Sequence, residues 1–247
     1  MRIKIMNLTR QIAVALYLAT ALAPRCAHAD DKAALAKARA KLEKQDAALN
    51  KIYTSLAASL GKAQAAELRA DERAWLDYRD HMADAAPWFN TGSNPDDPKT
   101  TVDYWHAMES FTSERVDFLR AWTGKSVPPG ITGEYSDCHG GDLDLEETNS
   151  GVKFRITAVR GTRAHIGEIG GVIHPRDGAA RFVETLDATI APAEPSCELT
   201  FTFIDGHIVK ISQKNHDPNA GSGVWYEGTY RKMGRLKKPI GDPSSYQ

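Results

Sequence analysis

The chain has 247 residues, with 31 Lys and Arg side chains against 32 Asp and Glu and a formal net charge of −1. This length allows one large domain or two small ones. A balance so close to neutral argues against nucleic acid and anionic lipid as partners, because both attract proteins with an excess of cations.

Residues 1–29 have the pattern of a secretory signal peptide. Basic residues precede the apolar run 12–22, and Ala27-His28-Ala29 has the small-x-small pattern of a signal peptidase site. The apolar run is too short for a stable membrane span. We expect cleavage after Ala29 and a periplasmic or secreted protein without a membrane span. Cleavage removes four cations and no acids, which leaves 27 basic and 32 acidic side chains. This balance of about −5 also argues against nucleic acid and anionic lipid, and it mildly favours a cationic partner.

Two cysteines, Cys138 and Cys197, remain after this cleavage. Secretion exposes them to an oxidising compartment, so we predict one disulfide between them that closes a long loop. Two free thiols are the alternative. The wide spacing of the cysteines does not suggest a metal-binding knuckle.

Residues 30–124 predict three helices. Leu35, Leu42, Leu49 and Leu56 recur every seven residues, which gives one apolar stripe along a helix. A break near residue 61 separates this helix from a second one, which a proline at position 87 should end. The first two helices should form an antiparallel hairpin. A third helix should start at a capping threonine near residue 101 and stop near residue 124.

After a linker at 125–130, the hydrophobic period changes from that of a helix to that of a strand. Asp205-Gly206 is a strong two-residue hairpin signal. Gly133-x-Tyr135 and Gly228-x-Tyr230 suit a meander whose first and last strands pair, which removes exposed edges. The predicted fold class is α+β: a three-helix unit at 30–124 and an antiparallel β-barrel or curled sheet of seven or eight strands at 131–233. A mobile tail follows at 234–247.

The helical residues also carry a family pattern, which consists of Asp46, Leu49-Asn50, Tyr53, Leu56, Arg73-Ala74-Trp75-Leu76, Tyr78-Arg79-Asp80, Phe111-Thr112-Ser113-Glu114-Arg115 and Leu119. With this pattern, residues 40–122 resemble the lysozyme inhibitor LprI-like N-terminal domain family of bacterial secreted and envelope proteins. The resemblance implies binding and inhibition of a lysozyme. Members often carry cysteines flanking the helical pair, but Met82 and Ala83 stand where one is expected. The β region resembles the tail domain of some relatives more loosely.

Within this pattern, Asp46, Asn50, Arg79 and Asp80 lie close to the apolar stripes. They form either a polar binding site between helices or a structural network in which an aspartate holds Arg79 and fixes the helix register. We favour the structural interpretation, because polar groups at helix seams commonly specify pairing. Tyr53, Trp75 and Tyr78 are interpreted as core residues rather than as a ligand platform, and Leu49 as a structural residue of the pattern.

A glycine-rich loop at 214–223 is the candidate partner-binding loop, with His216, Ser222, Gly223 and Tyr226 as its candidate contacts. Its Ser-Gly-x-x-Tyr order resembles the loop of the membrane-bound and periplasmic C-type lysozyme inhibitors. In that class a polar loop enters the enzyme cleft and bonds the catalytic carboxylates. A hydroxyl and a cation on a preorganised loop suit such a role. An ordinary hairpin loop is the alternative, and it is the one we favour.

The histidines of the β region lack the spacing of a zinc site, and the sequence offers no constellation for catalysis. We therefore predict a binding protein without metal, cofactor or enzymatic activity, whose partner is a lysozyme or another cell-wall hydrolase. The alternative is an envelope module that holds a small molecule or wall fragment inside the barrel. An open interior lined by Phe154, Phe182, Phe201 and Phe203 would favour that alternative, and a packed one would favour protein binding.

Overall fold

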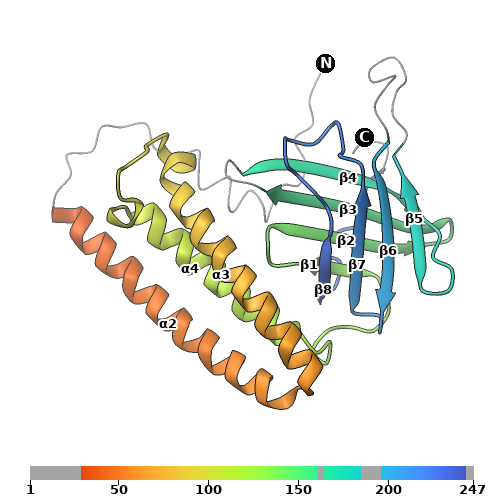
Figure 1. Cartoon of the computed structure of the whole chain (residues 1–247), viewed down its shortest axis with the longest axis horizontal. Coiled ribbons are helices and arrows are strands. Elements are labelled where there is room, and N and C mark those ends of the chain that lie inside the picture. Colours follow the sequence, from red (N-terminus) through yellow and green to blue (C-terminus); the bar gives the residue numbers. More distant parts are fainter. Residues whose placement is uncertain (1–28, 161–163, 185–195, 243–247) are drawn as a thin grey trace.

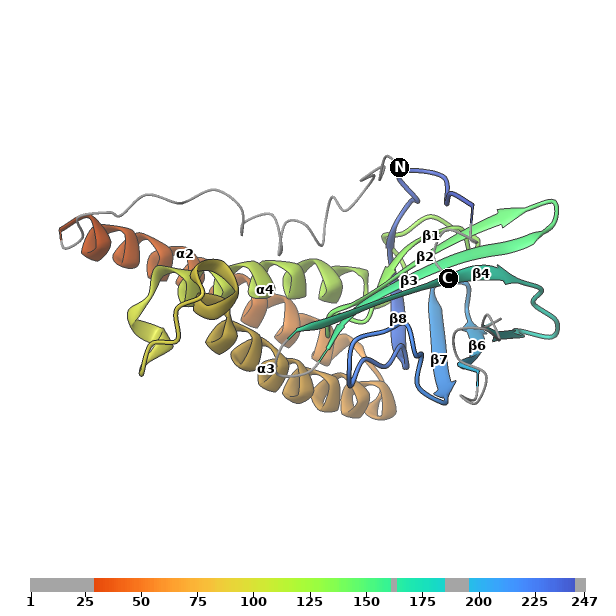
Figure 2. The same ribbon diagram turned by 90° about the horizontal axis from the view of Figure 1, so that it is seen from above.

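The computed structural model describes residues 29–160, 164–184 and 196–242, and the predicted signal peptide lies outside these ranges except for Ala29. In this part of the chain, three helices precede an eight-stranded antiparallel sheet that curls into a nearly closed barrel (Figure 1). The α+β fold class predicted from the sequence is confirmed. The two units lie side by side, with the helices against one flank of the barrel (Figure 2).

The helical unit consists of α2 (Ala29–Ser59), α3 (Lys62–Thr91) and α4 (Val102–Ala121), with a short 3₁₀ turn, η2 (Pro98–Thr100), before α4. Gly61 caps α3, and the Thr101 hydroxyl accepts a hydrogen bond from the backbone N–H of Tyr104 at the start of α4, as predicted. The prediction that Pro87 ends the second helix is wrong. The helix continues for one turn and ends at Gly92, whose positive φ of 67° supplies the left-handed cap.

Both α2 and α3 pack mainly against α4 rather than against each other. Their leucines and Trp75 meet the inner face of α4 in one cluster, which contains Leu49, Leu56, Leu68, Trp75, Val116, Phe118, Leu119 and Trp122. Because α4 occupies the space between the other two helices on one side, the opposite side of the α2–α3 pair stays open.

The sheet consists of β1 (Gly133–Ser136), β2 (Gly141–Thr148), β3 (Gly151–Arg160), β4 (His165–Ile173), β5 (Ala179–Val183), β6 (Glu198–Ile204), β7 (Ile208–Lys214) and β8 (Gly228–Gly234). Its spatial order is β4-β3-β2-β1-β8-β7-β6-β5, and each neighbouring pair is antiparallel. The first and last strands therefore pair, as their Gly-x-Tyr ends predict, with Tyr135 opposite Lys232. The open seam lies between β4 and β5.

Aromatic side chains fill the interior of the barrel and close this seam. The Phe154 ring lies 4.9 Å from the rings of both Phe182 and Phe201, and all three are buried, while Phe203 is partly buried against the same cluster. Phe182 of β5 packs directly over Gly171 of β4, where an added Cβ would lie 2.3 Å from the ring. The seam is thus sealed by packing at a glycine rather than by strand hydrogen bonds.

The helical and β units share an interface built on β8. The Arg231 guanidinium lies 3.6 Å from the centre of the Trp122 ring at the end of α4, and its Nη2 is 2.8 Å from a carboxylate oxygen of Glu67 on α3. The neighbouring Lys232 is buried and donates to the carbonyl oxygens of Pro128 and Gly130. The segment that connects the two units is thereby held against the sheet.

The predicted disulfide between Cys138 and Cys197 is not formed, since both are free cysteines. Cys138, in the turn between β1 and β2, packs against the helical cluster, whereas Cys197 is buried in the barrel core. Two different hydrophobic clusters hold the two thiols, which is incompatible with a bond of about 2 Å. Burial raises the pKa of both thiols, that of Cys197 to about 12, so they stay protonated at neutral pH.

The tail predicted to be mobile is anchored to the sheet as far as Ile240. This side chain is buried, its backbone N–H donates to Glu146, and its carbonyl oxygen accepts from Lys153 at 3.3 Å. Lys237 also pairs with Glu134 at 3.0 Å. The prediction failed here because the polar composition of the tail concealed an apolar residue, Ile240, that lies beside the neighbouring strands β2 and β3.

Replacement of Arg231 by alanine (Arg231→Ala) should lower the free energy of unfolding by about 2 to 3 kcal/mol, because a desolvated cation–π contact and a partly exposed ion pair are lost. Chemical denaturation followed by helical circular dichroism and by tryptophan fluorescence measures this change.

Lys210→Ala on the neighbouring strand β7 is the control, because Lys210 is exposed. It should change stability by less than about 0.5 kcal/mol. An Arg231→Ala protein as stable as the Lys210→Ala protein would contradict the role given to this interface.

Candidate functional site

The open side of the helical unit forms a groove of about 730 Å³ between α2 and α3. Asp46, Leu49, Asn50 and Tyr53 of α2 line it, together with Ala66, Arg69, Glu72, Arg73, Leu76 and Arg79 of α3. Seven of these positions belong to the family pattern identified in the sequence (Asp46, Leu49, Asn50, Tyr53, Arg73, Leu76, Arg79). The sequence therefore identified much of the lining, although it indicated a packed helix seam where the structure has an open groove.

The predicted network around Arg79 is present, but its contact between the two helices is long. Arg79 pairs with Asp80, its neighbour on the same helix, at 2.8 Å, whereas its contact with Asp46 across the groove is 3.7 Å long. Burial raises the pKa of Asp46, an effect that Arg79 opposes and Asp80 reinforces. Trp75, which supports Arg79 from below, is fully buried in the helical core, as predicted.

The other carboxylate of the groove, Glu72, is held from beneath by Arg115 of α4. The fully buried Arg115 side chain donates to Glu72 at 2.9 and 3.0 Å and to Asp71 at 2.6 Å. Burial alone would lower the pKa of Arg115, but Asp71, Cys138 and Glu72 outweigh this effect and raise it. The Glu72 carboxylate is thus already neutralised by Arg115, a cation of the protein itself.

By contrast, Arg69 and Arg73 have no hydrogen bond or ion pair within residues 29–160, 164–184 and 196–242. Both are exposed, and they stand one helical turn apart on the groove face of α3. The groove therefore offers two unpaired guanidinium groups beside the apolar surfaces of Leu49, Leu76 and Tyr53. Such a surface can bind an anionic partner that also has apolar side chains.

The four predicted contacts of the candidate loop between β7 and β8 differ in how exposed they are. Tyr226 is buried, and its hydroxyl donates to Asp217 at 2.6 Å, so this side chain supports the loop from inside the barrel. His216 is partly buried, with its ring 5.9 Å from that of Trp225. Only Ser222 and Gly223 of the four predicted contacts are exposed.

This loop folds back onto the start of β4. The backbone N–H of Gly221 donates to the carbonyl oxygen of Ile166, and the carbonyl oxygen of Ser222 lies 2.6 Å from Nδ1 of His165. Ile166 and Trp225 are 58% and 39% exposed, respectively, and are large apolar side chains of this barrel end. Neither residue was identified from the sequence as a candidate contact, because neither interrupts the alternation of apolar and polar residues or the turn pattern around it.

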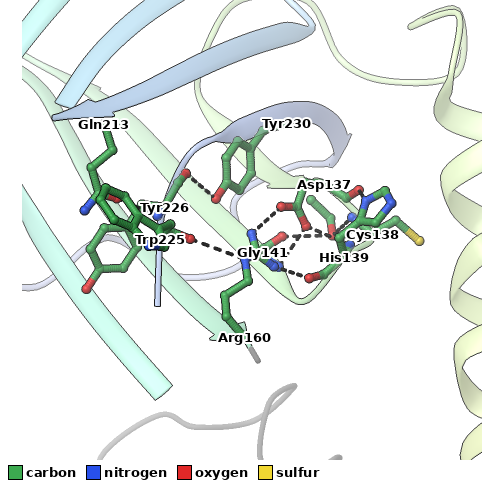
Figure 3. A network of polar contacts seen from close by, with 10 residues as sticks. Asp137, Cys138, His139, Gly141, Arg160, Gln213, Trp225, Tyr226 and Tyr230 are labelled. Atoms are coloured by element: carbon green, nitrogen blue, oxygen red, sulfur yellow. Dashed lines mark hydrogen bonds and ion pairs between the residues drawn. The ribbon is translucent and has the colours of Figure 1, made fainter. Parts of the chain in front are cut away.

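A polar network centred on Arg160 connects this loop to the turn that faces the helices (Figure 3). Arg160 donates to Asp137, to the carbonyl oxygen of His139, and at 3.3 Å to the carbonyl oxygen of Trp225. Tyr230 donates to the carbonyl oxygen of Tyr226 at 2.9 Å. Since the ring of His139 also lies 5.9 Å from that of Tyr78 on α3, the network extends from the loop to the helical unit.

Two buried carboxyl groups lie beneath the loop. Asn219 bridges them, because its backbone N–H donates to Asp217 at 2.7 Å and its side chain donates to Glu184 at 3.1 Å. One carboxylate oxygen of Glu184 is buried and has no hydrogen bond to any of the described residues. Burial raises the pKa of Glu184, the charge of Asp217 raises it further, and the bond from Asn219 opposes both.

No group of three or more His, Cys, Asp and Glu side chains in the described ranges is arranged to hold a metal ion. The helices of the described residues also lack a stretch both long and apolar enough to span a membrane.

These features define an α+β protein with an open, arginine-lined groove on a three-helix unit. The family model described as "Lysozyme inhibitor LprI" matches residues 26–119, a range that covers α2, α3 and all but the last two residues of α4, and that is less than half of the chain. The resemblance predicted for the helical segment is thereby confirmed, while the β domain lies outside the match. No curated protein and no solved structure matches the chain.

Replacement of Tyr226 by phenylalanine (Tyr226→Phe) should lower the free energy of unfolding by about 1 to 3 kcal/mol, because the buried Asp217 carboxylate loses a donor. Urea denaturation measures the loss. Tyr53→Phe in the groove is the matched control and should change stability by less than about 0.5 kcal/mol. Equal stability of the two variants would show that the Tyr226 hydroxyl does not hold the loop.

Replacement of Glu184 by glutamine (Glu184→Gln) should stabilise the protein at neutral pH. Because the pKa of Glu184 is higher in the folded than in the unfolded state, wild-type stability falls as pH rises from the unfolded pKa through the folded one. The variant should match the wild type at pH 4 and melt a few degrees higher at pH 7.5. Thermal unfolding of both proteins between pH 4 and pH 7.5 tests this prediction. A difference in melting temperature that is the same at every pH would contradict it.

Proposed function

We propose that this protein is a non-catalytic, periplasmic or secreted inhibitor that binds a lysozyme or a related cell-wall hydrolase through the α2–α3 groove. The observation that carries the proposal is the position of the family pattern. Its polar and aromatic residues line an exposed groove rather than a closed helix seam. An open surface built from a family's own signature residues is where a shared binding activity is expected.

The family match supports the same surface, because it covers both helices that line the groove and stops before the β domain. Three arginines stand in the groove, and two of them have no partner in the described part of the chain. Unpaired guanidinium groups beside apolar side chains are typical of interface hot spots. In this proposal the β domain supports the helices and presents the loop around Ser222 as a secondary contact.

Among the described residues, no observation favours the alternative, a small-molecule site within the barrel. Phe154 packs edge to face against Phe182 and in a tilted contact against Phe201, and all three are buried. A ligand would have to displace these rings, which are close-packed as in an ordinary protein core. From the sequence, a packed barrel interior is the outcome expected of a protein-binding domain, and an open interior is the outcome expected of a ligand-binding one.

The proposal predicts that purified residues 30–247 stop the lysis of a peptidoglycan suspension by at least one of the c-type, g-type and i-type lysozymes. Inhibition should be complete near one inhibitor per enzyme. A double replacement in the groove, Arg69→Glu with Arg73→Glu, should raise the concentration needed for half inhibition at least tenfold, because it reverses the charge of the contact surface.

The control is Arg176→Glu with Arg235→Glu, which makes the same charge change at two exposed arginines, one in the β domain and one in the tail that follows it. It should inhibit like the wild type. A Ser222→Ala, Trp225→Ala protein tests the loop instead, and loss of inhibition there alone would move the site to the barrel end. Unhindered lysis by all three enzyme types would refute the proposed function.

A further inference from the structure

The two unpaired arginines of the groove have a defined spacing. Arg69 and Arg73 are four residues apart on α3, which separates them by about 6 Å along the helix axis. Alternate side chains of an extended peptide point to the same side and are about 6.7 Å apart. Two carboxylates at positions i and i+2 of an extended segment therefore match the two guanidinium groups.

The length of the groove also fits such a segment. Its lining on α3 runs from Ala66 to Arg79, which spans about 20 Å at the helical rise. An extended chain covers this length with about six residues. Tyr53, Leu49 and Leu76 supply apolar surface beside the arginines, so flanking apolar side chains of the segment would be covered as well.

The volume of the groove favours an extended segment over a helix. A helix 20 Å long and at least 10 Å wide occupies about 1,600 Å³ or more. A single extended strand of the same length occupies about 1,000 Å³ at the strand and sheet spacings of proteins. The groove measures about 730 Å³ and is open to solvent on one side, so part of a strand remains outside it.

The charges in the groove determine whether an anionic or a cationic segment binds there. The acids of the groove are already engaged, Glu72 by Arg115 and Asp46 by Arg79, although the latter contact is long. Any additional charge brought into the groove therefore meets Arg69 and Arg73. A cationic segment would leave these two groups unpaired and would be repelled, whereas carboxylates accept bidentate bonds from guanidinium groups.

We propose that the α2–α3 groove binds an extended acidic peptide segment of the pattern acid-x-acid, flanked by apolar residues, with Arg69 and Arg73 each holding one carboxylate. This inference deepens the proposed function and rests on it for the location of the site. It specifies that the partner hydrolase contributes an extended acidic strand or loop to the complex.

The test is fluorescence anisotropy of labelled six-residue peptides with purified residues 30–247. The first probe has the sequence Leu-Glu-Leu-Glu-Tyr-Ala. A second has the same composition with adjacent glutamates, a third has lysines in place of the glutamates, and a fourth is a longer helical peptide with glutamates four residues apart. The first should bind at least threefold more tightly than the second or the fourth, and the third should not bind.

The double variant Arg69→Glu, Arg73→Glu should bind the first peptide at least tenfold more weakly than the wild type. Arg69→Lys with Arg73→Lys should lose about threefold, because the charge remains but the bidentate geometry is lost. The Arg176→Glu, Arg235→Glu protein is again the control and should bind like the wild type. Circular dichroism of each variant verifies that it is folded.

Equal binding of the first peptide by the wild type and by the groove double variant would overturn the inference, as would preference for the lysine peptide or the helical peptide. The peptide readout is independent of the lysis assay. Inhibition of lysis without peptide binding would reject this inference and keep the proposed function. Peptide binding that needs both arginines, without inhibition of any lysozyme, would support the inference and reject the proposed function.

Discussion

The buried Arg115 on α4 is the interaction on which the helical unit depends. It donates to Asp71 and Glu72 of α3 and lies over the rings of Trp75 and Phe118, and its charge opposes the rise in the pKa of the Cys138 thiol from the β domain. A charge taken fully out of water is stable only with partners of this kind. Arg115 therefore fixes α3 against α4, and it draws inward one of the two carboxylates that would otherwise neutralise the groove.

The groove is a consequence of that arrangement. With α4 packed between α2 and α3, these two helices have little contact with each other, and the faces turned away from α4 remain in solvent. The β domain packs on the side of the helical unit where α4 lies, because Arg231 stacks on Trp122 and Cys138 packs against the helical cluster. The groove and the domain interface thus occupy opposite faces of α3, and each can be rigid without obstructing the other.

Much of the fold could be predicted because its signals are local. The leucine stripe, the glycine between α2 and α3, the threonine cap and the hairpin turns all act within a few residues. The predictions at Pro87 and at the tail failed for the opposite reason. Helix α3 ends where a glycine provides the left-handed cap, and the tail stays on the sheet because Ile240 finds a site between Glu146 and Lys153. Composition alone does not reveal such a site.

The candidate site shows the same division. The sequence by itself determined which residues carry the family pattern, that helices precede strands, and that the first and last strands share a Gly-x-Tyr signature. Only the tertiary structure decided that Arg69 and Arg73 lack partners among the described residues and that Tyr226 points into the barrel. It also decided that the two thiols lie in separate cores and that Phe182 seals the open seam over Gly171. Periodicity records how each residue relates to its neighbours along the chain. Pairing and exposure depend instead on contacts between segments far apart in sequence, and packing alone brings those segments together.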